Sequence, residues 1–160
     1  MKKCILLAFS FLYGHTVCGM DDAIKRGDFY SMQRIINQNE WQRYPEKDLK
    51  RWLVSVLSQI VKNTEDYQGS LDQDEDKEAF LKASADNSNL LQILELLFDM
   101  GADPNWDLLL DMRKVKPLNF AEVGDSLFEC LRKEGASEII VKTKEEAGYY
   151  QTLGLTPVFK

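Results

Sequence analysis

The sequence contains one histidine and three cysteines among its 160 residues. The histidine (His15) and two cysteines (Cys4 and Cys18) lie in the first twenty residues, so a chain without this segment keeps only Cys130. A protein without histidine has no Ser-His-Asp or Cys-His machinery and no ordinary zinc site. A single cysteine forms no intramolecular disulfide. We therefore expect neither enzymatic activity nor a bound cofactor or metal.

Basic residues are in the minority, with 20 Lys and Arg against 26 Asp and Glu, and the formal net charge is −6. Nucleic acids and anionic membranes are polyanions, so this charge disfavours both as partners. A hydrophobic fraction of 44% argues against disorder, and the length suits one domain with its own core. We expect a folded domain whose partner is another protein, with no membrane attachment in the mature form.

The first nineteen residues have the pattern of a secretory signal peptide. Two lysines precede an apolar stretch at 4–13, which is shorter than the roughly twenty residues that a membrane-spanning helix needs. The residues at 17–19 suit a signal peptidase. We expect a signal peptide over 1–19, a mature chain that starts near Met20, and a periplasmic or secreted protein. A buried N-terminal element and a lipoprotein acylated at Cys18 are the alternatives.

Three stretches share the pattern of a short helix, a tight break and a longer amphipathic helix: residues 21–40, 83–105 and 116–137. In the last two stretches a Gly-Ala pair closes the second helix. Gly101 and Gly135 lie 34 positions apart, and a period of this length is typical of a solenoid. We therefore expect stacked helical layers that are separated by glycine corners.

The second stretch has apolar residues on two flanks of one helix. One flank holds Leu90, Ile93, Leu94 and Leu97, and the other holds Leu91 and Phe98. A helix that is apolar on two sides packs between neighbours, as an inner layer of a stack does.

These stretches resemble ankyrin repeats, in which two helices and a projecting loop recur about every 33 residues. "LELLFDMGADPN" (94–105) is very similar to the end of that family's second helix, and "AIKRGDF" (23–29) resembles its first-helix exit. "KPLNFA" (116–121) is similar to the Thr-Pro-Leu-His opening, with Lys116 for Thr and Asn119 for His. The resemblance implies about three to four repeats over 20–137. Its corner residues would be Gly27, Gly101, Ala102, Asp103, Pro104, Pro117, Gly135 and Ala136.

The middle of the chain and its C-terminal end depart from this pattern. A long helix that follows Pro45 has one apolar face, formed by Leu49, Trp52, Leu53, Val56, Leu57 and Ile60. An acidic stretch near 64–78 is predicted to be an insertion loop, and residues 138–160 are predicted to cap the stack, with Thr143 and Glu146 at capping-box spacing. We expect an all-α fold, a short ankyrin-like helical repeat solenoid with an irregular middle repeat and a C-terminal cap.

The acidic stretch begins like a calcium-binding loop, because Asp72, Asp74 and Asp76 alternate. Lys77 stands where that loop requires glycine, however, and Ala83 stands where it requires glutamate. A solvated acidic loop is the better interpretation.

Other reactive side chains also have ordinary explanations. Cys130 falls on a helix face that we expect to be buried, where a thiol is inert. Two carboxylate pairs, Glu122 with Asp125 and Asp107 with Asp111, have the elements of an acid pair. Nothing in their spacing separates them from ordinary surface charge.

The candidate partner-binding residues lie in two loops. Trp106 follows the Pro104-Asn105 corner, where the ankyrin family projects a loop, and an exposed tryptophan there would anchor an interface. Packing within the loop is the alternative for this residue. The full candidate set is Trp41, Tyr44, Trp106, Asp107, Arg113 and Lys114.

The resemblance implies a scaffold that holds another protein. We interpret the chain as an exported bacterial binding module, an inhibitor or immunity protein that masks a toxin or an enzyme. A secreted host-directed effector and a periplasmic accessory to a stress enzyme are alternative binding roles. A carboxylate-dependent hydrolase is the alternative from a different class, and the sequence offers it only the two carboxylate pairs.

Overall fold

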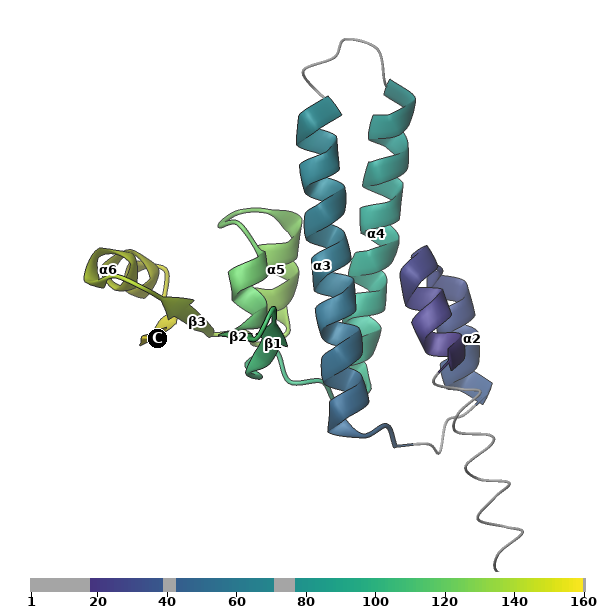
Figure 1. Ribbon diagram of the computed structural model, residues 1–160, viewed down its shortest axis with the longest axis horizontal. Coiled ribbons are helices and arrows are strands. Elements are labelled where there is room, and N and C mark those ends of the chain that lie inside the picture. Colours follow the sequence, from purple (N-terminus) through teal and green to yellow (C-terminus); the bar gives the residue numbers. More distant parts are fainter. Residues whose placement is uncertain (1–17, 39–42, 71–76, 160) are drawn as a thin grey trace, which may run out of the picture.

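The computed structural model describes the backbone of residues 18–38, 43–70 and 77–159, with side chains described outside 66–86. This part of the chain is mostly helical and also contains two small two-stranded sheets. The elements lie side by side along the long axis of the molecule, from α2 (Phe29–Gln38) through α4 (Lys77–Asp99) and α3 (Glu46–Ser70) to the end that holds α6 (Lys144–Thr152), so α3 and α4 are not in chain order (Figure 1). The expected signal peptide lies outside the described residues, except for residues 18–19, and Trp41 and residues 71–76 lie outside them entirely.

A pair of short helices opens the described chain. Residues 18–26 are helical, and α2 spans Phe29–Gln38. Gly27 turns the chain between them with a φ of +60°, a left-handed conformation that glycine adopts without steric cost. The predicted helix, break and helix are therefore confirmed for the described part of 21–40.

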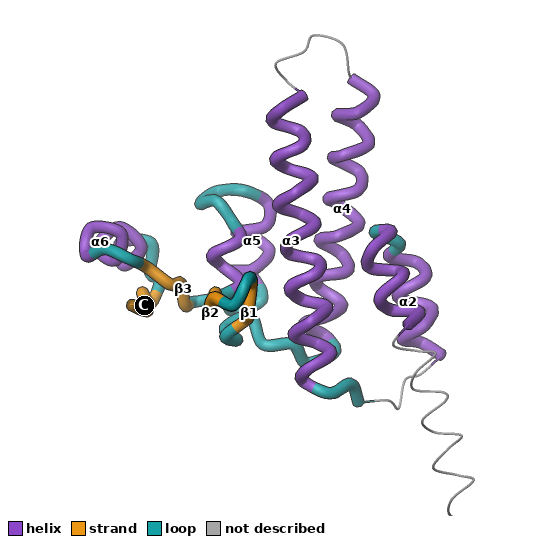
Figure 2. The backbone as a smooth tube through the Cα atoms, viewed as in Figure 1, coloured by secondary structure: helices purple, strands orange, loops and turns teal. Residues whose placement is uncertain are grey.

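The central layer is a long antiparallel hairpin of α3 (Glu46–Ser70) and α4 (Lys77–Asp99), which extends beyond its neighbours in Figure 2. Every residue of the predicted apolar face of α3 is at most 5% exposed. The first predicted flank of α4, which includes Leu90 and Leu97, is fully buried. Because α4 packs against α3, α2 and α5, the prediction of a helix between neighbours is confirmed.

Two predictions about this layer are wrong. Residues 83–105 contain no break before the helix end, since α4 runs unbroken from Lys77. The acidic stretch is not a continuous loop, because residues 64–70 belong to α3 and residues 77–78 to α4. Residues 77–97 contain no glycine or proline, and the Ala, Lys, Glu and Leu among them favour a helix, which explains the unbroken α4. At the start of the acidic stretch, α3 continues to Ser70 although this part includes Gly69.

The loop after α4 contains an antiparallel β-hairpin, so the all-α prediction is wrong for this segment. Gly101 ends α4 with a φ of +99°, a left-handed cap, so the predicted glycine corner is confirmed here. Strand β1 (Leu108–Leu110) then pairs with β2 (Arg113–Val115). Hydrogen bonds between the two strands can satisfy backbone groups that an irregular loop would leave to water.

The next layer follows the prediction for 116–137. A 3₁₀ helix, η1 (Pro117–Phe120), precedes α5 (Ser126–Lys133). The side chain of Asp125 accepts from the Phe128 amide and caps α5. Gly135 closes the layer with a φ of +92°.

The C-terminal unit is a strand, a helix and a parallel strand, so the all-α prediction is also wrong for this segment. Strand β3 (Glu138–Val141) pairs with β4 (Thr156–Phe159), and α6 (Lys144–Thr152) connects them. The β-branched residues in "EIIV" and "TPVF" favour strands. The capping box of Thr143 and Glu146 is confirmed.

Candidate interaction site

The β1–β2 hairpin has the tightest connection that two antiparallel strands allow. Leu110 pairs with Arg113, so only Asp111 and Met112 form the turn. Their φ angles are +48° and +62°. Two positive φ angles define the type I′ turn, which matches the twist of a hairpin and is usually built from asparagine and glycine. Here a bulky apolar side chain occupies a position that glycine would occupy without strain.

The two faces of the hairpin differ. Side chains alternate along a strand, so Leu108 and Leu110 share one face while Leu109 points to the other. Leu108 is buried and Leu109 is 69% exposed. Met112, at the turn, is 98% exposed. The hairpin therefore attaches through one face and presents apolar side chains to solvent from its other face and its tip.

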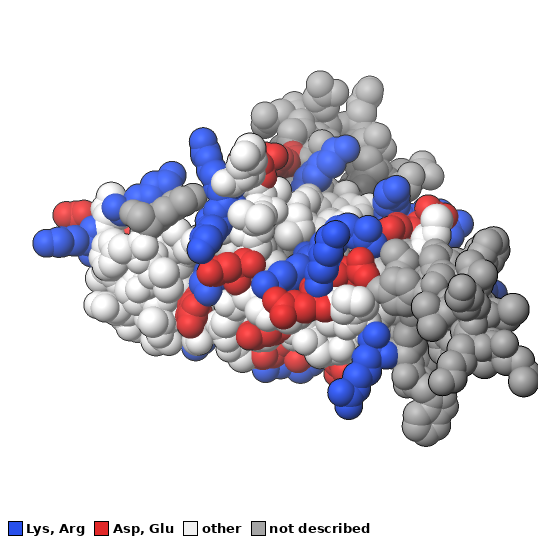
Figure 3. Space-filling view, turned by 60° about the horizontal axis from the view of Figure 1, so that its bottom comes forward, with Lys and Arg blue, Asp and Glu red and all other residues white. Residues whose placement is uncertain are grey.

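Charged side chains surround these apolar groups. Arg113 is exposed, and Lys114 Nζ lies 3.8 Å from a carboxylate oxygen of Asp107. A hollow on the face of the hairpin that carries Leu108 and Leu110 is lined by Leu110, Asp111, Arg113 and Val115. Over the face seen in Figure 3, basic and acidic side chains are interspersed. The candidate contact surface is therefore the hairpin's apolar tip with its neighbouring charges, and not a large patch of one charge.

The base of the hairpin is held by Lys116, the one charged side chain that is buried among those described. Its Nζ lies 3.0 Å from Asp107 Oδ1 and 2.6 Å from Glu138 Oε2. It also donates a hydrogen bond of 2.7 Å to the carbonyl oxygen of Asn105. Burial by itself lowers the pKa of Lys116, but the bonds to Glu138 and Asp107 outweigh burial and raise it. The ammonium ion is therefore the stable form at this position.

Trp106 is not an exposed tryptophan of a projecting loop, because it packs against the core of the protein. Its side chain is half-buried against the core, and Lys50 Nζ lies 5.2 Å from the centre of its ring. That distance allows a cation–π interaction. Trp106 thus joins the hairpin's base to α3 and leaves the exposed positions to Leu109 and Met112.

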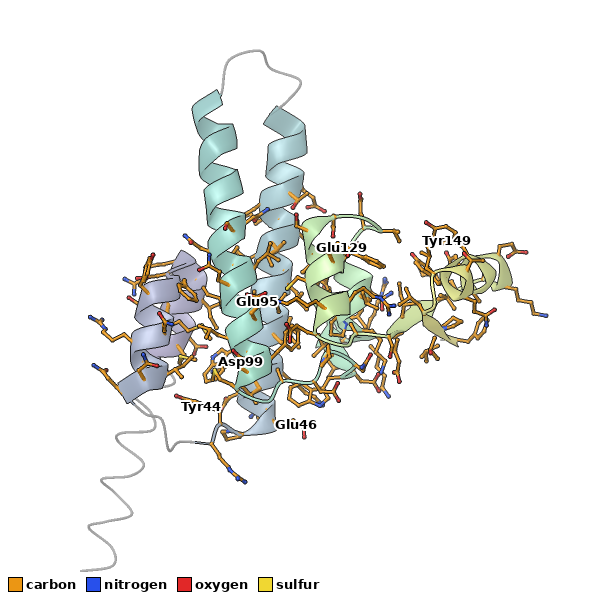
Figure 4. All side chains as sticks on the ribbon, turned by 180° about the vertical axis from the view of Figure 1, so that it is seen from behind. Tyr44, Glu46, Glu95, Asp99, Glu129 and Tyr149 are labelled. Carbon is orange, nitrogen blue, oxygen red and sulfur yellow. The ribbon has the colours of Figure 1, made fainter. Side chains whose placement is uncertain are left out.

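Tyr44 also packs inward, at the start of α3 close to Glu46 (Figure 4). Its ring meets that of Trp52 edge to face at 5.4 Å. The Tyr44 hydroxyl is buried and has no hydrogen-bond partner among the described residues, and burial raises its pKa. Of the six candidate residues, Trp106, Asp107, Arg113 and Lys114 thus belong to the hairpin and its base, whereas Tyr44 packs against α3.

Two of the four carboxylates considered for acid catalysis, Asp125 and Asp107, have structural partners. Asp125 Oδ1 accepts from the Phe128 amide at the start of α5, and Oδ2 accepts from the Glu122 amide. Asp107 is paired with Lys116, and this bond lowers its pKa. Cys130 is half-buried and packs against the edge of the core, so its predicted core position is met only in part, and burial raises its pKa to about 11. These side chains stabilise helix ends and packing contacts.

Two observations concern larger functional classes. Within the described residues, no cluster of three or more His, Cys, Asp or Glu side chains is arranged to hold a metal ion, and the aspartates of the calcium-like pattern lie outside that part. In the same part of the chain, no helix combines the length and apolarity needed to cross a membrane.

Comparison with protein-family models, with curated proteins and with solved structures gave no match. Three residues that the geometry makes prominent, Leu109, Met112 and Lys116, were not among the partner-binding candidates. Arg113 and Lys114, which were, flank the exposed tip.

Proposed function

We propose that this chain is an exported protein-binding module, an ankyrin-like stack of helical layers whose contact element is the β1–β2 hairpin. The layered order of the helices and the glycine corners at Gly27, Gly101 and Gly135 support a repeat-like scaffold. The projecting hairpin stands where the ankyrin resemblance implies a contact loop. Such a module acts by masking or tethering its partner and breaks no bonds.

The observation that carries this proposal is the position of Met112. An apolar side chain that is 98% exposed contributes little to folding, and its left-handed backbone costs about 1–2 kcal/mol. Strain of this kind is typical of binding and switch segments. A bound partner would remove the Met112 and Leu109 side chains from water and would turn this exposed area into binding energy.

The chemistry of the tip indicates the partner. Met112 and Leu109 fit an apolar pocket, and Arg113 and Lys114 fit carboxylates at the rim of that pocket. A methionine adapts to irregular pockets because its side chain is unbranched and flexible. An inhibitor or immunity protein that covers the active surface of a toxin or an enzyme has this form, with one protruding element inserted into the target.

Site-specific photo-crosslinking tests the contact element. A benzophenone amino acid replaces Met112 in one variant and Val123 in a control, because Val123 is also exposed but lies before α5. We expect crosslinks to one dominant protein from position 112 and none to that protein from position 123. Equal crosslinking at both positions would remove the hairpin from the proposal.

The identified partner is then purified and titrated with the intact chain. We expect a one-to-one complex that Met112→Ala weakens about tenfold, equivalent to about 1.4 kcal/mol. Leu109→Ala should weaken binding in the same direction. If neither substitution changes the dissociation constant, the hairpin tip is not the contact element.

A further inference from the structure

Lys116 occupies a particular place in the hairpin's topology. It is the first residue after β2, and Asp107 is the last residue before β1. The 3.0 Å contact between Lys116 Nζ and Asp107 Oδ1 therefore closes the open end of the hairpin. The two strands are joined by the turn at one end and by this ion pair at the other.

The same ammonium group reaches two further segments. Glu138 Oε2, at 2.6 Å, belongs to β3 of the C-terminal unit. The Asn105 carbonyl, at 2.7 Å, belongs to the corner that follows α4. The ammonium group thus donates one hydrogen bond, to the Asn105 carbonyl, and forms ion pairs with the carboxylates of Asp107 and Glu138. Since the Lys116 side chain is only 8% exposed, water competes weakly for these bonds.

A second set of bonds connects the corner to the C-terminal unit. Asn105 Oδ1 accepts from the amides of Ser137 and Glu138, at 2.8 and 3.1 Å. Its Nδ2 donates to the Gly135 carbonyl at 3.1 Å. Strand β3, which Lys116 joins to the hairpin, is therefore also attached to the corner through Asn105. A movement of the hairpin against β3 must break the bonds of Lys116.

We propose that Lys116 is a positioning residue that fixes the β1–β2 hairpin to β3, so that the C-terminal unit is part of the binding element and not only a cap. The importance of Lys116 for binding rests on the proposed function. A hairpin that is already held in one orientation loses less conformational entropy when it binds a partner. The attachment of the hairpin to β3 by Lys116 is a property of this chain and is measurable without a partner.

Lys114 offers a matched control on the same hairpin. It is also a lysine near Asp107, but its Nζ is 3.8 Å from the carboxylate and its side chain is 68% exposed. Lys114→Met and Lys116→Met remove the same charge from positions two residues apart. The first removes an exposed cation, whereas the second removes the buried junction of three segments.

Hydrogen–deuterium exchange of the whole protein provides the first measurement. In Lys116→Met we expect the amides of 107–116 and 138–141 to exchange roughly tenfold faster, with the rates of the α3–α4 core unchanged. Lys114→Met should leave all three regions unchanged. Faster exchange of the core in the same proportion would show that Lys116 only supports global stability and would overturn the inference.

The second measurement reads the hairpin's orientation. In a background without native cysteines, spin labels at Met112→Cys and Glu145→Cys report the distance from the hairpin tip to α6. We expect a narrow distance distribution that broadens in Lys116→Met and also, to a smaller extent, in Glu138→Gln, which keeps the side-chain size. Glu138 is 38% exposed, so this second variant should still fold if Lys116→Met does not.

An unchanged distribution in both variants, or equal broadening in Lys114→Met, would overturn the positioning role. Loss of the positioning role would leave the crosslinking result at Met112 untouched. Conversely, a hairpin that is held by Lys116 but gives no crosslinks would contradict only the proposed function.

Discussion

The indole Nε1 of Trp52 donates a hydrogen bond of 2.7 Å to Oδ1 of Asp21. Arg51 contacts the same carboxylate oxygen at 3.2 Å. Trp52 is completely buried in the second turn of α3, while Asp21 lies in the helix at 18–26. This carboxylate therefore satisfies a buried donor of the central layer and attaches the first helix to it.

Removing the Asp21 carboxylate should destabilise the protein measurably. In Asp21→Ala the indole N–H loses its acceptor, and we expect the free energy of unfolding to fall by about 1–3 kcal/mol. Urea denaturation followed by tryptophan fluorescence measures it. Asp22→Ala is the control, since Asp22 is exposed, and should change stability by less than about 0.5 kcal/mol. Equal losses in the two variants would show that the Trp52 bond is unimportant.

The predictions that succeeded depend on local patterns. The apolar face that begins at Leu49 and the flank that begins at Leu90 could be predicted because apolar residues recur at helical spacing along the sequence. Gly27 and Gly101 were readable because few residues other than glycine adopt a left-handed cap. These signals require only neighbours in the sequence, and they located most helices and the breaks between the layers.

The predictions that failed depend on distant neighbours. The hairpin at 108–115 carries no Asn-Gly or Asp-Gly turn, so the strongest short-range signal for a hairpin is absent from its sequence. The parallel pairing of β3 with β4 joins segments on either side of α6. The contacts of Trp106 with Lys50 and of Lys116 with Glu138 join residues that are far apart in the sequence, so no local pattern predicts them.

Asn119 should stabilise the C-terminal unit through its side chain. Its Oδ1 accepts from the Lys116 and Ile140 amides at 2.9 and 3.1 Å, and its Nδ2 donates to the Ile140 carbonyl at 2.9 Å. We expect Asn119→Ala to lower the free energy of unfolding by about 1 kcal/mol, because these partially exposed partners regain water. Thermal unfolding followed by circular dichroism measures the change.

Asn119→Asp separates the two kinds of bond in this contact. Aspartate keeps both acceptor bonds but loses the donor to the Ile140 carbonyl, so its melting temperature should lie between those of the intact protein and Asn119→Ala. If Asn119→Ala melts like the intact protein, the side chain does not hold β3.

The thiol of Cys130 should react slowly at neutral pH. Burial, with smaller contributions from Glu95 and Glu134, raises its pKa to about 11, and only the thiolate is nucleophilic. The rate of iodoacetamide labelling, resolved by peptide mass spectrometry, should therefore be low at neutral pH in the folded protein, rise about tenfold per pH unit and level off only above about pH 11. The same peptide in urea provides the control and should react readily near pH 9.

The sign of the stability change follows from the same shift. Between the pKa of an unfolded cysteine, about 8.5, and that of folded Cys130, the unfolded chain holds fewer protons, so the free energy of unfolding falls as pH rises. Cys130→Ala should remove this part of the decline. Rapid labelling of the folded protein at pH 8 would contradict the burial of the thiol.

Met112 offers the sharpest separation between folding and binding. Replacing it by glycine relieves a left-handed backbone that costs about 1–2 kcal/mol, and the greater freedom of glycine in the unfolded chain offsets part of this gain. We expect Met112→Gly to raise the free energy of unfolding by about 0.5–1 kcal/mol in urea titrations.

The same variant loses the exposed apolar side chain, so its affinity for the crosslinked partner should fall. Leu109→Gly is the control, because this strand position has no positive φ to relieve and should lose both stability and affinity. Opposite signs at position 112 would mean that the chain keeps a strained methionine for binding, whereas a destabilised Met112→Gly or an unchanged affinity would contradict that explanation.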